Sequence, residues 1–205
     1  MNAIRLSCPG IDTGPFWIPS FQLRTGDLVC LHIPGPIYYA EEETQIIRIL
    51  TGKRPGLEQF GRTCWVDPPT CQMGLIGLFY QPRPVTWLRK TARISREQAE
   101  TITTRLGLRP EWRNCQLGGN PRALLALEAA WALGAETVIF STSGCDPLGC
   151  QALYDAVLSK IHQCPAVHLS HEFWTNGRRM RDCHPKARCI ELTRQSDSPA
   201  SRKSA

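Results

Sequence analysis

The chain has 205 residues, of which 42% are hydrophobic, and it carries a formal net charge of +6. This length and this hydrophobic content exclude a disordered chain and predict one full core, or one domain with a small lobe. No apolar run approaches the about 20 residues that a membrane helix needs, and the first ten residues lack the charged-then-apolar order of a signal peptide. We therefore expect a cytoplasmic protein, with peripheral attachment at the inner face of a membrane left open.

The ten cysteines are irregularly spaced and include no Cys-x-x-Cys pair, so we expect mostly reduced thiols in the core. A zinc site can be drawn from six residues in the second half of the chain, but their spacing matches no standard ligand pattern, and we expect no metal site. These six residues are Cys164, His168, His171, Cys183, His184 and Cys189.

Basic residues gather between Arg178 and Arg188 and again in the polar tail. Such clusters can bind nucleic acid or anionic lipid, but a solvated face is the commoner explanation. We do not expect nucleic acid as a partner.

The first half of the chain predicts strands followed by helices. Residues 1–33 indicate short strands separated by turns, of which Leu28–Ile33 is the most apolar. An apolar-periodic helix then ends near Gly52, and residues 64–81 contain short extended runs broken by Pro and Gly. Residues 95–106 are typical of a helix with Ser95 as its N-cap.

The second half predicts alternating helices and strands. Asn120 is expected to cap a helix that starts at Pro121 and stops at Gly134. A buried strand over Thr137–Phe140 follows, and Asp146 is expected to cap the next helix, which continues to Ile161.

Further strands are expected at Val167–Leu169 and Cys189–Leu192. Alternating strands and helices favour an α/β fold whose parallel sheet has helices on both faces. Ligands in such sheets bind beyond the carboxyl ends of the strands, so the loops after Ile33, Phe140 and Leu169 are expected to share one edge.

The connection between Ile33 and the following helix has the layout of a phosphate-binding loop. Such a loop needs glycines whose N–H groups wrap the phosphates, a lysine for the terminal phosphates, and a Ser or Thr hydroxyl for magnesium. Counting back from Gly52, Glu43 takes the lysine position and Glu42 a glycine position, and only Thr44 fits its role.

Two segments carry a resemblance to a known family. Leu117–Arg122, a helix, a strand and then Thr142–Gly149 resemble the signature motif, its helix, the Walker B strand and the D-loop of ATP-binding cassette (ABC) transporter nucleotide-binding domains. The resemblance spans roughly residues 1–192. It implies a P-loop NTPase-like α/β fold of the ABC ATPase type, with an N-terminal antiparallel β part and a shortened helical lobe.

The resemblance also implies a domain organisation. We expect one ABC ATPase-like domain over residues 1–194, with a reduced helical subdomain over residues 82–116. The tail, residues 195–205, is polar and is expected to be disordered.

The resemblance assigns roles to particular residues. Gln81 matches the Q-loop glutamine, and His171 matches the switch histidine that contacts the terminal phosphate. Gly118 and Gly119 match signature glycines, and Asp146 matches the D-loop aspartate. Two further nucleotide-binding candidates are Thr44 and Trp17, the latter in the place of the aromatic that stacks on adenine, although Trp17 as a core residue remains the simpler interpretation.

Departures from the family pattern fall on the chemistry. Glu43 replaces the lysine, Ser141 and Thr142 replace the Walker B carboxylates, and Leu117 takes or displaces the signature serine. We therefore expect no meaningful ATPase activity, with Gln81 and His171 vestigial, and a cofactor that is absent or at most weakly bound ATP with Mg²⁺.

Three functions follow from these residues. The first is a non-catalytic or regulatory partner of an active ABC ATPase subunit, joined to it head to tail, and through it to a membrane permease. The second is an ATP-hydrolysing domain with a rearranged site. The third is an unrelated cysteine-dependent enzyme that uses Cys145 or Cys150 with His168 or His171 as the base, or an unrelated binding module.

Overall fold

The computed structural model describes residues 3–34, 40–70, 81–175, 178–181 and 184–194. The chain divides into two compact units. Unit 1 comprises Met1–Trp65, Glu136–Ser141 and Lys160–Ala205, and unit 2 comprises Val66–Ala135 and Thr142–Ser159.

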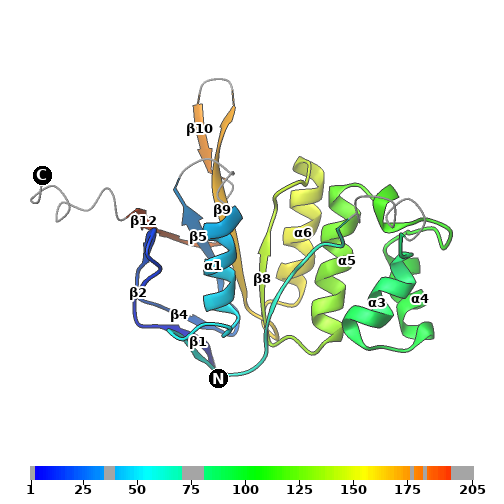
Figure 1. Ribbon diagram of the computed structural model, residues 1–205, viewed down its shortest axis with the longest axis horizontal. Helices are drawn as coiled ribbons and strands as arrows, with labels where there is room; N and C mark the ends of the chain where they lie inside the picture. The colour runs from blue at the N-terminus through cyan, green and yellow to red at the C-terminus, as the bar shows by residue number, and fades with distance from the viewer. Residues whose placement is uncertain (1–2, 35–39, 71–80, 176–177, 182–183, 195–205) are drawn as a thin grey trace, which may run out of the picture. The chain divides into compact units, whose positions relative to one another are not determined.

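Unit 1 is built on a parallel sheet with strand order β11-β5-β9-β8-β7. Every neighbouring pair along this order is parallel. The strands are β5 (Leu28–Ile33), β7 (Thr63–Trp65), β8 (Thr137–Ser141), β9 (Ala166–Thr175) and β11 (Arg188–Glu191). The mainly parallel α/β sheet expected from the sequence is thereby confirmed (Figure 1).

Two antiparallel sheets complete the β structure of unit 1. Their strand orders are β4-β1-β6 and β12-β3-β2. The strands are β1 (Ile4–Cys8), β2 (Ile11–Asp12), β3 (Phe16–Ile18), β4 (Phe21–Arg24), β6 (Glu58–Gln59) and β12 (Thr193–Arg194). The predicted N-terminal antiparallel part is therefore present, and it also includes a strand from the far end of the chain.

The core of unit 1 forms where α1 (Ala40–Leu50) packs on the parallel sheet. Ile46 and Leu50 of α1 are fully buried together with Leu31 of β5, Ile139 of β8 and Val167 of β9. All six residues of β5 are buried, as expected for a central parallel strand.

The other face of the parallel sheet carries buried polar groups. The Sγ of Cys30 lies 3.7 Å from Nδ1 of His168, and Nδ1 of His32 lies 3.4 Å from Oγ of Ser170. The His168 ring also stacks on Phe140, with ring centroids 5.0 Å apart. These contacts follow from the strand register, which pairs Cys30 and Phe140 with His168.

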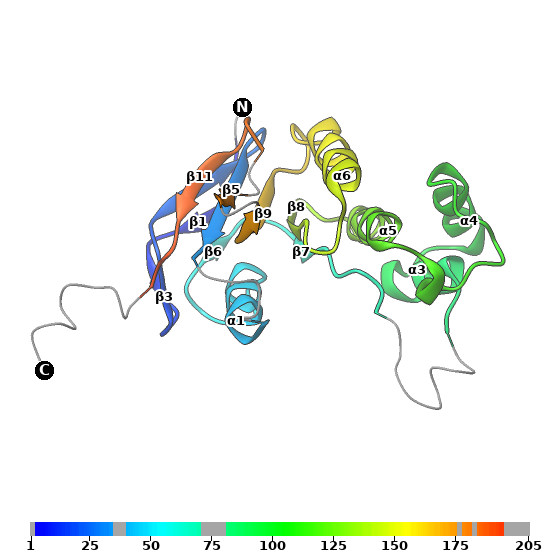
Figure 2. The ribbon, with the colours of Figure 1, turned by 90° about the horizontal axis from the view of Figure 1, so that it is seen from above.

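Unit 2 is helical. Its helices are α3 (Pro84–Ala92), α4 (Arg96–Arg105), the 3-10 helix η1 (Asn114–Gln116), α5 (Gly119–Ala132) and α6 (Pro147–Ser159). Within unit 2, α5 lies between α6 and α3, and α4 packs on α3 (Figure 2). The predicted N-cap Ser95 is confirmed, because its side chain accepts a hydrogen bond from the backbone N–H of Gln98 in a full capping box.

The start of α5 differs from the sequence prediction. The helix begins at Gly119 with Gly118 as its N-cap, so Asn120 lies inside the first turn. The side-chain oxygen of Asn120 instead accepts a hydrogen bond of 3.1 Å from the backbone N–H of Asp146. Asn120 therefore holds the start of α6 in place of capping its own helix.

Strand β9 is longer than predicted. It continues through His171 to Thr175, because β10 (Arg178–Arg181) pairs with its second half in an antiparallel hairpin (Figure 1). The loop expected after Leu169 is thus absent, and His171 is part of a strand.

Among the described residues, no helix is both long and apolar enough to cross a membrane. Seven of the described cysteines are free thiols, and Cys189 is disulfide-bonded. Burial raises the pKa of Cys8 and of Cys64, so both thiols remain protonated at neutral pH. The predicted disordered tail, residues 195–205, lies outside the described residues.

The buried His168 predicts acid sensitivity. Burial, with smaller contributions from His171 and His32, lowers its pKa from 6.5 to about 3. Between these pH values the unfolded chain binds a proton that the folded chain does not, so stability falls as the pH falls below 6.5. Relative to His168→Gln, the wild type should lose up to about 1 kcal/mol per pH unit in urea unfolding. Replacement of the exposed His162 by Gln is the control, and an equal pH profile for wild type and His168→Gln would contradict the assignment.

Candidate functional site

At the carboxyl edge of the parallel sheet, the last residue of β5 lies beside His171 of β9. The register pairs Ile33, the last residue of β5, with His171 of β9, and it pairs Ser141, the last residue of β8, with Leu169. In open parallel sheets this edge is where ligands bind. His171 is therefore placed where the sequence expected a ligand-contacting side chain, although on a strand and not in a loop.

Glu43 points toward this edge because of its position on α1. It lies three residues before Ile46 and seven before Leu50, which places it on the helix face that packs on the sheet. Its Oε1 lies 3.4 Å from Nε2 of His171, and the two side chains are 22% and 4% exposed. Glu43, at the position where the sequence pattern leads one to expect a lysine, thus lies beside His171.

Neither ring nitrogen of His171 has a hydrogen-bond partner among the described residues. A buried imidazole without such a partner costs free energy, since an unpaired polar group is unfavourable when it leaves water. Glu43 Oε1 lies within ion-pair distance of Nε2 without forming a hydrogen bond, and the pair is ionic when the imidazole is protonated. Among the described residues, Glu43 therefore supplies a charged neighbour for His171.

The first turn of α1 is acidic throughout. It contains Glu41, Glu42 and Glu43, and Oε2 of Glu42 is buried without a hydrogen-bond partner. The N-terminal end of a helix carries a partial positive charge and unpaired N–H groups, which is why phosphates bind there. Here the partial positive charge at the start of α1 is offset by the carboxylates of its own first turn. The preceding residues 35–39 of the expected phosphate loop lie outside the described residues.

The other candidates differ in exposure. Thr44 is exposed on α1. Ser141, the last residue of β8, is half-buried, and the following Thr142 is buried. Trp17 is 44% exposed in β3, which belongs to a separate antiparallel sheet, and its ring lies over Gly10.

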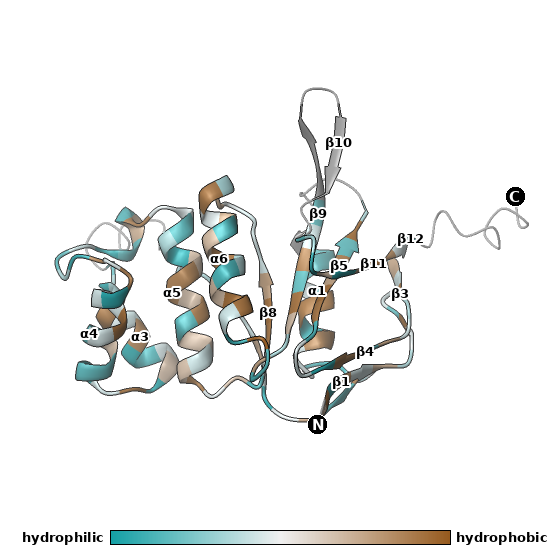
Figure 3. Ribbon diagram, turned by 180° about the vertical axis from the view of Figure 1, so that it is seen from behind, coloured by the Kyte–Doolittle hydropathy of each residue, from teal (hydrophilic) through white to brown (hydrophobic). Residues whose placement is uncertain are grey.

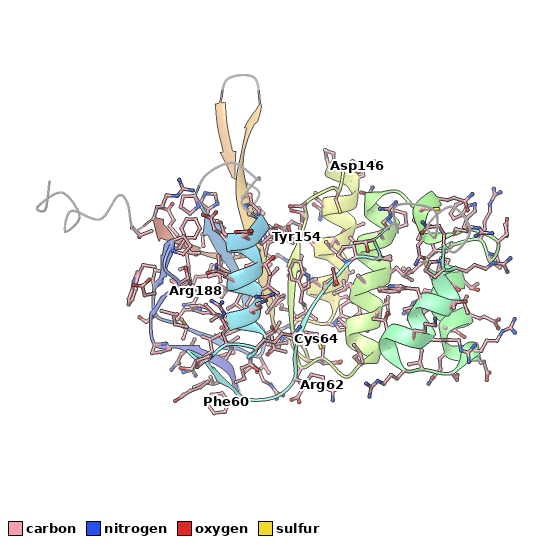
Figure 4. All side chains as sticks on the ribbon, viewed as in Figure 1. Phe60, Arg62, Cys64, Asp146, Tyr154 and Arg188 are labelled. Atoms are coloured by element: carbon pink, nitrogen blue, oxygen red, sulfur yellow. The ribbon has the colours of Figure 1, made fainter. Side chains whose placement is uncertain are left out.

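In unit 2 the signature-like and D-loop-like segments are in direct contact. A Cβ added to Gly119 would lie 1.7 Å from the carbonyl oxygen of Gly144, so the two backbones approach more closely than any side chain permits. The same segments are joined by the hydrogen bond between Asn120 and the N–H of Asp146. Figure 4 labels Asp146 at the N-terminal end of α6. Gly119 is therefore required by packing within the unit.

Asp146 caps α6, as the sequence predicts. Its Oδ1 accepts a hydrogen bond of 2.8 Å from the backbone N–H of Gly149. This bond, together with the Asn120 side chain, lowers the pKa of Asp146 below its ordinary value of 3.8. The carboxylate is thus ionised at neutral pH and fixed at the start of the helix.

Gly118 and Leu117 are neighbours that differ in burial. Gly118 is exposed, and an added Cβ would meet only Pro121 Cδ, at 3.9 Å. Leu117 is buried in the helical core of unit 2 with Leu88 and Leu125, so the position that resembles the signature serine serves packing. Gln81 is half-buried just before α3 and also belongs to unit 2.

Two interactions were missed at the sequence level. The helical spacing of Glu43 to the apolar residues of α1 indicates which face it occupies, but its contact with His171 depends on the strand register as well. The role of Asn120 had no such signal, because an Asn before Pro at a helix start is equally typical of an N-cap.

The residues of the zinc-site and cysteine-enzyme hypotheses can now be located in the structure. In the part of the chain that the structure describes, no group of three or more His, Cys, Asp or Glu side chains is placed to hold a metal ion. His168 and His171 point to opposite faces of β9 because they are an odd number of residues, three, apart in one strand. The close cysteine–histidine pair is Cys30 with His168, and both are fully buried.

Comparison with known proteins identifies the fold. No protein-family model matches the chain, and no curated protein matches it in sequence. Solved structures do match. One is a transporter assigned to the metal-chelate type of ABC transporters, in an inward-facing conformation, with 12% identity and a TM-score of 0.60 over 87% of this chain and 83% of that chain.

A second match is cbiO1 from Clostridium perfringens, part of the ABC transporter complex cbiONQ. It has 9% identity and a TM-score of 0.55, and the match covers 88% of each chain. A third is a bacterial Atm1-family ABC exporter with ATP bound, with 11% identity and a TM-score of 0.56. It covers all of this chain and 43% of that one. The chain thus has the fold of ABC ATPase domains, which confirms the resemblance at the level of fold.

The Gly119–Gly144 contact gives a stability prediction. Gly119→Ala should lower the free energy of unfolding by about 3 kcal/mol or more, because the methyl group forces two backbones apart. Gly118→Ala is the matched control and should change it by less than about 1 kcal/mol, since its site is open and its φ is −68°. Urea unfolding of the three proteins measures both values. Equal stability of the two variants would show that the close approach is absent.

Proposed function

We propose that this protein is a catalytically degenerate member of the ABC ATPase fold, which acts as a non-catalytic partner or regulatory subunit of an active ABC ATPase. The observation that carries the proposal is the contact between Glu43 and the buried His171. The chain's own carboxylate takes the place at which a nucleotide phosphate would meet lysine and histidine.

Electrostatics supports weak nucleotide binding. A unit charge about 4 Å from a phosphate is worth roughly 4 kcal/mol at an effective dielectric near 20. Losing the lysine forfeits an attraction of this order, and Glu43 adds a repulsion of similar size. Since about 1.4 kcal/mol is a factor of ten in affinity, either change alone weakens phosphate binding by roughly a thousandfold.

The end of β8 argues against hydrolysis. Ser141 and Thr142 offer no carboxylate to polarise water or to bind magnesium, and phosphoryl transfer depends almost entirely on such positioning and charge stabilisation. Gln81 and His171 are then vestigial, and His171 is engaged by Glu43. On this account ATP with Mg²⁺ is bound weakly or not at all.

The partnership rests on what unit 2 retains. Gly118 is exposed at the start of α5, and Asp146 is held in a fixed loop at the start of α6. A subunit that lacks its own phosphate site can still present these loops to nucleotide bound by an active partner in a head-to-tail dimer. One structural neighbour, cbiO1, is itself part of a multi-subunit transporter complex. A membrane permease, and a place at the inner face of the membrane, would be reached through that partner.

Nucleotide titration tests the degenerate site. We expect no saturable heat when the wild type is titrated with millimolar Mg-ATP in a calorimeter. Glu43→Lys should give saturable binding, because it replaces a repulsive charge by an attractive one beside His171. Glu58→Lys makes the same charge change at an exposed position of unit 1 and should give none. Saturable binding by the wild type would overturn the proposal, and equal gains in both variants would assign the effect to net charge.

Association tests the partnership. The tagged chain, isolated from its own cells after cross-linking, should carry an ABC ATPase that has an intact phosphate-loop lysine, identified by mass spectrometry. Gly118→Trp should abolish this capture without unfolding the chain, because the glycine is exposed and its surroundings are open. Thr104→Trp, at an exposed position of α4, should leave it intact. A chain that is solitary, or captured equally well by all three proteins, contradicts the proposed role.

A further inference from the structure

Helix α3 presents a basic face that is separate from the site described above. Its positions Pro84, Leu88 and Ala92 are buried in the helical core of unit 2. The exposed side chains of α3 are Thr86, Arg89, Lys90 and Thr91. The exposed Arg83 and Arg93 flank the helix as its end caps, so every charged side chain here is cationic.

The spacing of these residues forms a stripe along the helix. Arg83 and Lys90 are seven residues apart, and Arg89 and Arg93 are four apart, so each pair lies on nearly the same side. Figure 3 shows α3 with hydrophilic and hydrophobic residues on different sides of the ribbon. The helix is therefore amphipathic, with arginine and lysine supplying all of the charge of its outer side.

Arg113 extends the stripe beyond the start of α3. The backbone N–H of Asn114 donates a hydrogen bond of 3.0 Å to the carbonyl oxygen of Pro82. Pro82 precedes Arg83, and Asn114 follows the exposed Arg113. The bond therefore brings the backbone at Arg83 close to the backbone at Arg113. We name these five residues the α3 basic face: Arg83, Arg89, Lys90, Arg93 and Arg113.

Few carboxylates lie near the α3 basic face in the sequence. The sequence has no acidic residue between Asp67 and Glu97. Two nearby arginines, outside the face, are already paired, Arg96 with Glu100 and Arg105 with Glu128. The five residues of the face form no ion pair with any residue that the structure describes, and Glu97 and Glu111 are the acidic residues nearest to them in sequence. Five uncompensated cations on one small surface create a strong positive potential.

We propose that the α3 basic face binds the anionic headgroups of a lipid bilayer surface. Clusters of four to eight Lys and Arg residues on an amphipathic helix are the pattern that anionic membranes recognise. None of the exposed large hydrophobic residues of the described chain lies on this face, so adsorption is electrostatic and does not involve insertion.

A lipid surface fits this face better than nucleic acid does. Single strands are held by exposed aromatic side chains on which bases stack. The aromatic residues of this region, Trp87 and Trp112, pack against the helical core, and the Trp112 ring is also covered by Arg109. A stripe of nine helical residues spans only about 14 Å, which is short for a groove that follows a phosphate backbone. The inference needs neither the degenerate site nor an ABC ATPase partner.

Vesicle flotation tests the inference directly. The full chain should float with vesicles in which about a third of the lipid is phosphatidylserine and not with pure phosphatidylcholine, and high salt should release it. Replacement of Arg83, Arg89 and Lys90 by Gln should weaken this binding by about a hundredfold, because each basic residue near such a surface contributes about fivefold. Arg93 is left unchanged because its φ is 55°, in the left-handed region.

The matched control removes the same charge elsewhere. Arg48, Lys53 and Arg54 are exposed in unit 1, and their replacement by Gln should leave vesicle binding within a few-fold of wild type. Circular dichroism checks that both triple variants are folded. Three results would each overturn the inference: no flotation of the wild type with anionic vesicles, equal losses in both triple variants, or salt-sensitive binding to a single-stranded oligonucleotide but not to vesicles.

Discussion

The contact between Glu43 and His171 is the interaction on which the functional account depends. Parallel pairing of β5 and β9 sets His171 level with the end of β5, and the apolar periodicity of α1 turns Glu43 toward the same edge. The side chain of His171 is 4% exposed, and a carboxylate oxygen lies 3.4 Å from its Nε2. On the proposed function, this carboxylate and the acidic first turn of α1 disfavour a phosphate at this edge of the sheet.

The region of the expected phosphate loop in unit 1 contrasts with unit 2, where the signature-like and D-loop-like segments are closely packed. Gly119 is held against Gly144 at a distance that no side chain tolerates, and Asn120 and Asp146 lock the starts of two helices together. These contacts maintain the geometry of the signature-like and D-loop-like segments independently of any nucleotide bound by unit 1. The proposed partner role rests on this contrast, because the exposed Gly118 lies at the start of a helix whose neighbouring loop is fixed by these contacts.

Much of the fold could be predicted from the sequence because local signals agree with tertiary structure there. The strand Leu28–Ile33, the cap at Ser95 and the cap at Asp146 follow from apolar runs and hydrogen-bonding side chains. The prediction was wrong where the local structure depends on a residue or strand that is distant in sequence. Asn120 bonds to Asp146 in the next helix, and β9 extends because β10 pairs with it. At the site, the charge of Glu43 was evident from the sequence, but its contact with His171 depends on strand register, which no local pattern encodes.

A crystal structure of the wild-type protein grown in millimolar Mg-ATP tests the central claim most directly. The account predicts that Oε1 of Glu43 remains beside Nε2 of His171, with no phosphate density at the N-terminal end of α1. Nucleotide phosphates bound at His171, with Glu43 displaced toward solvent, would contradict it.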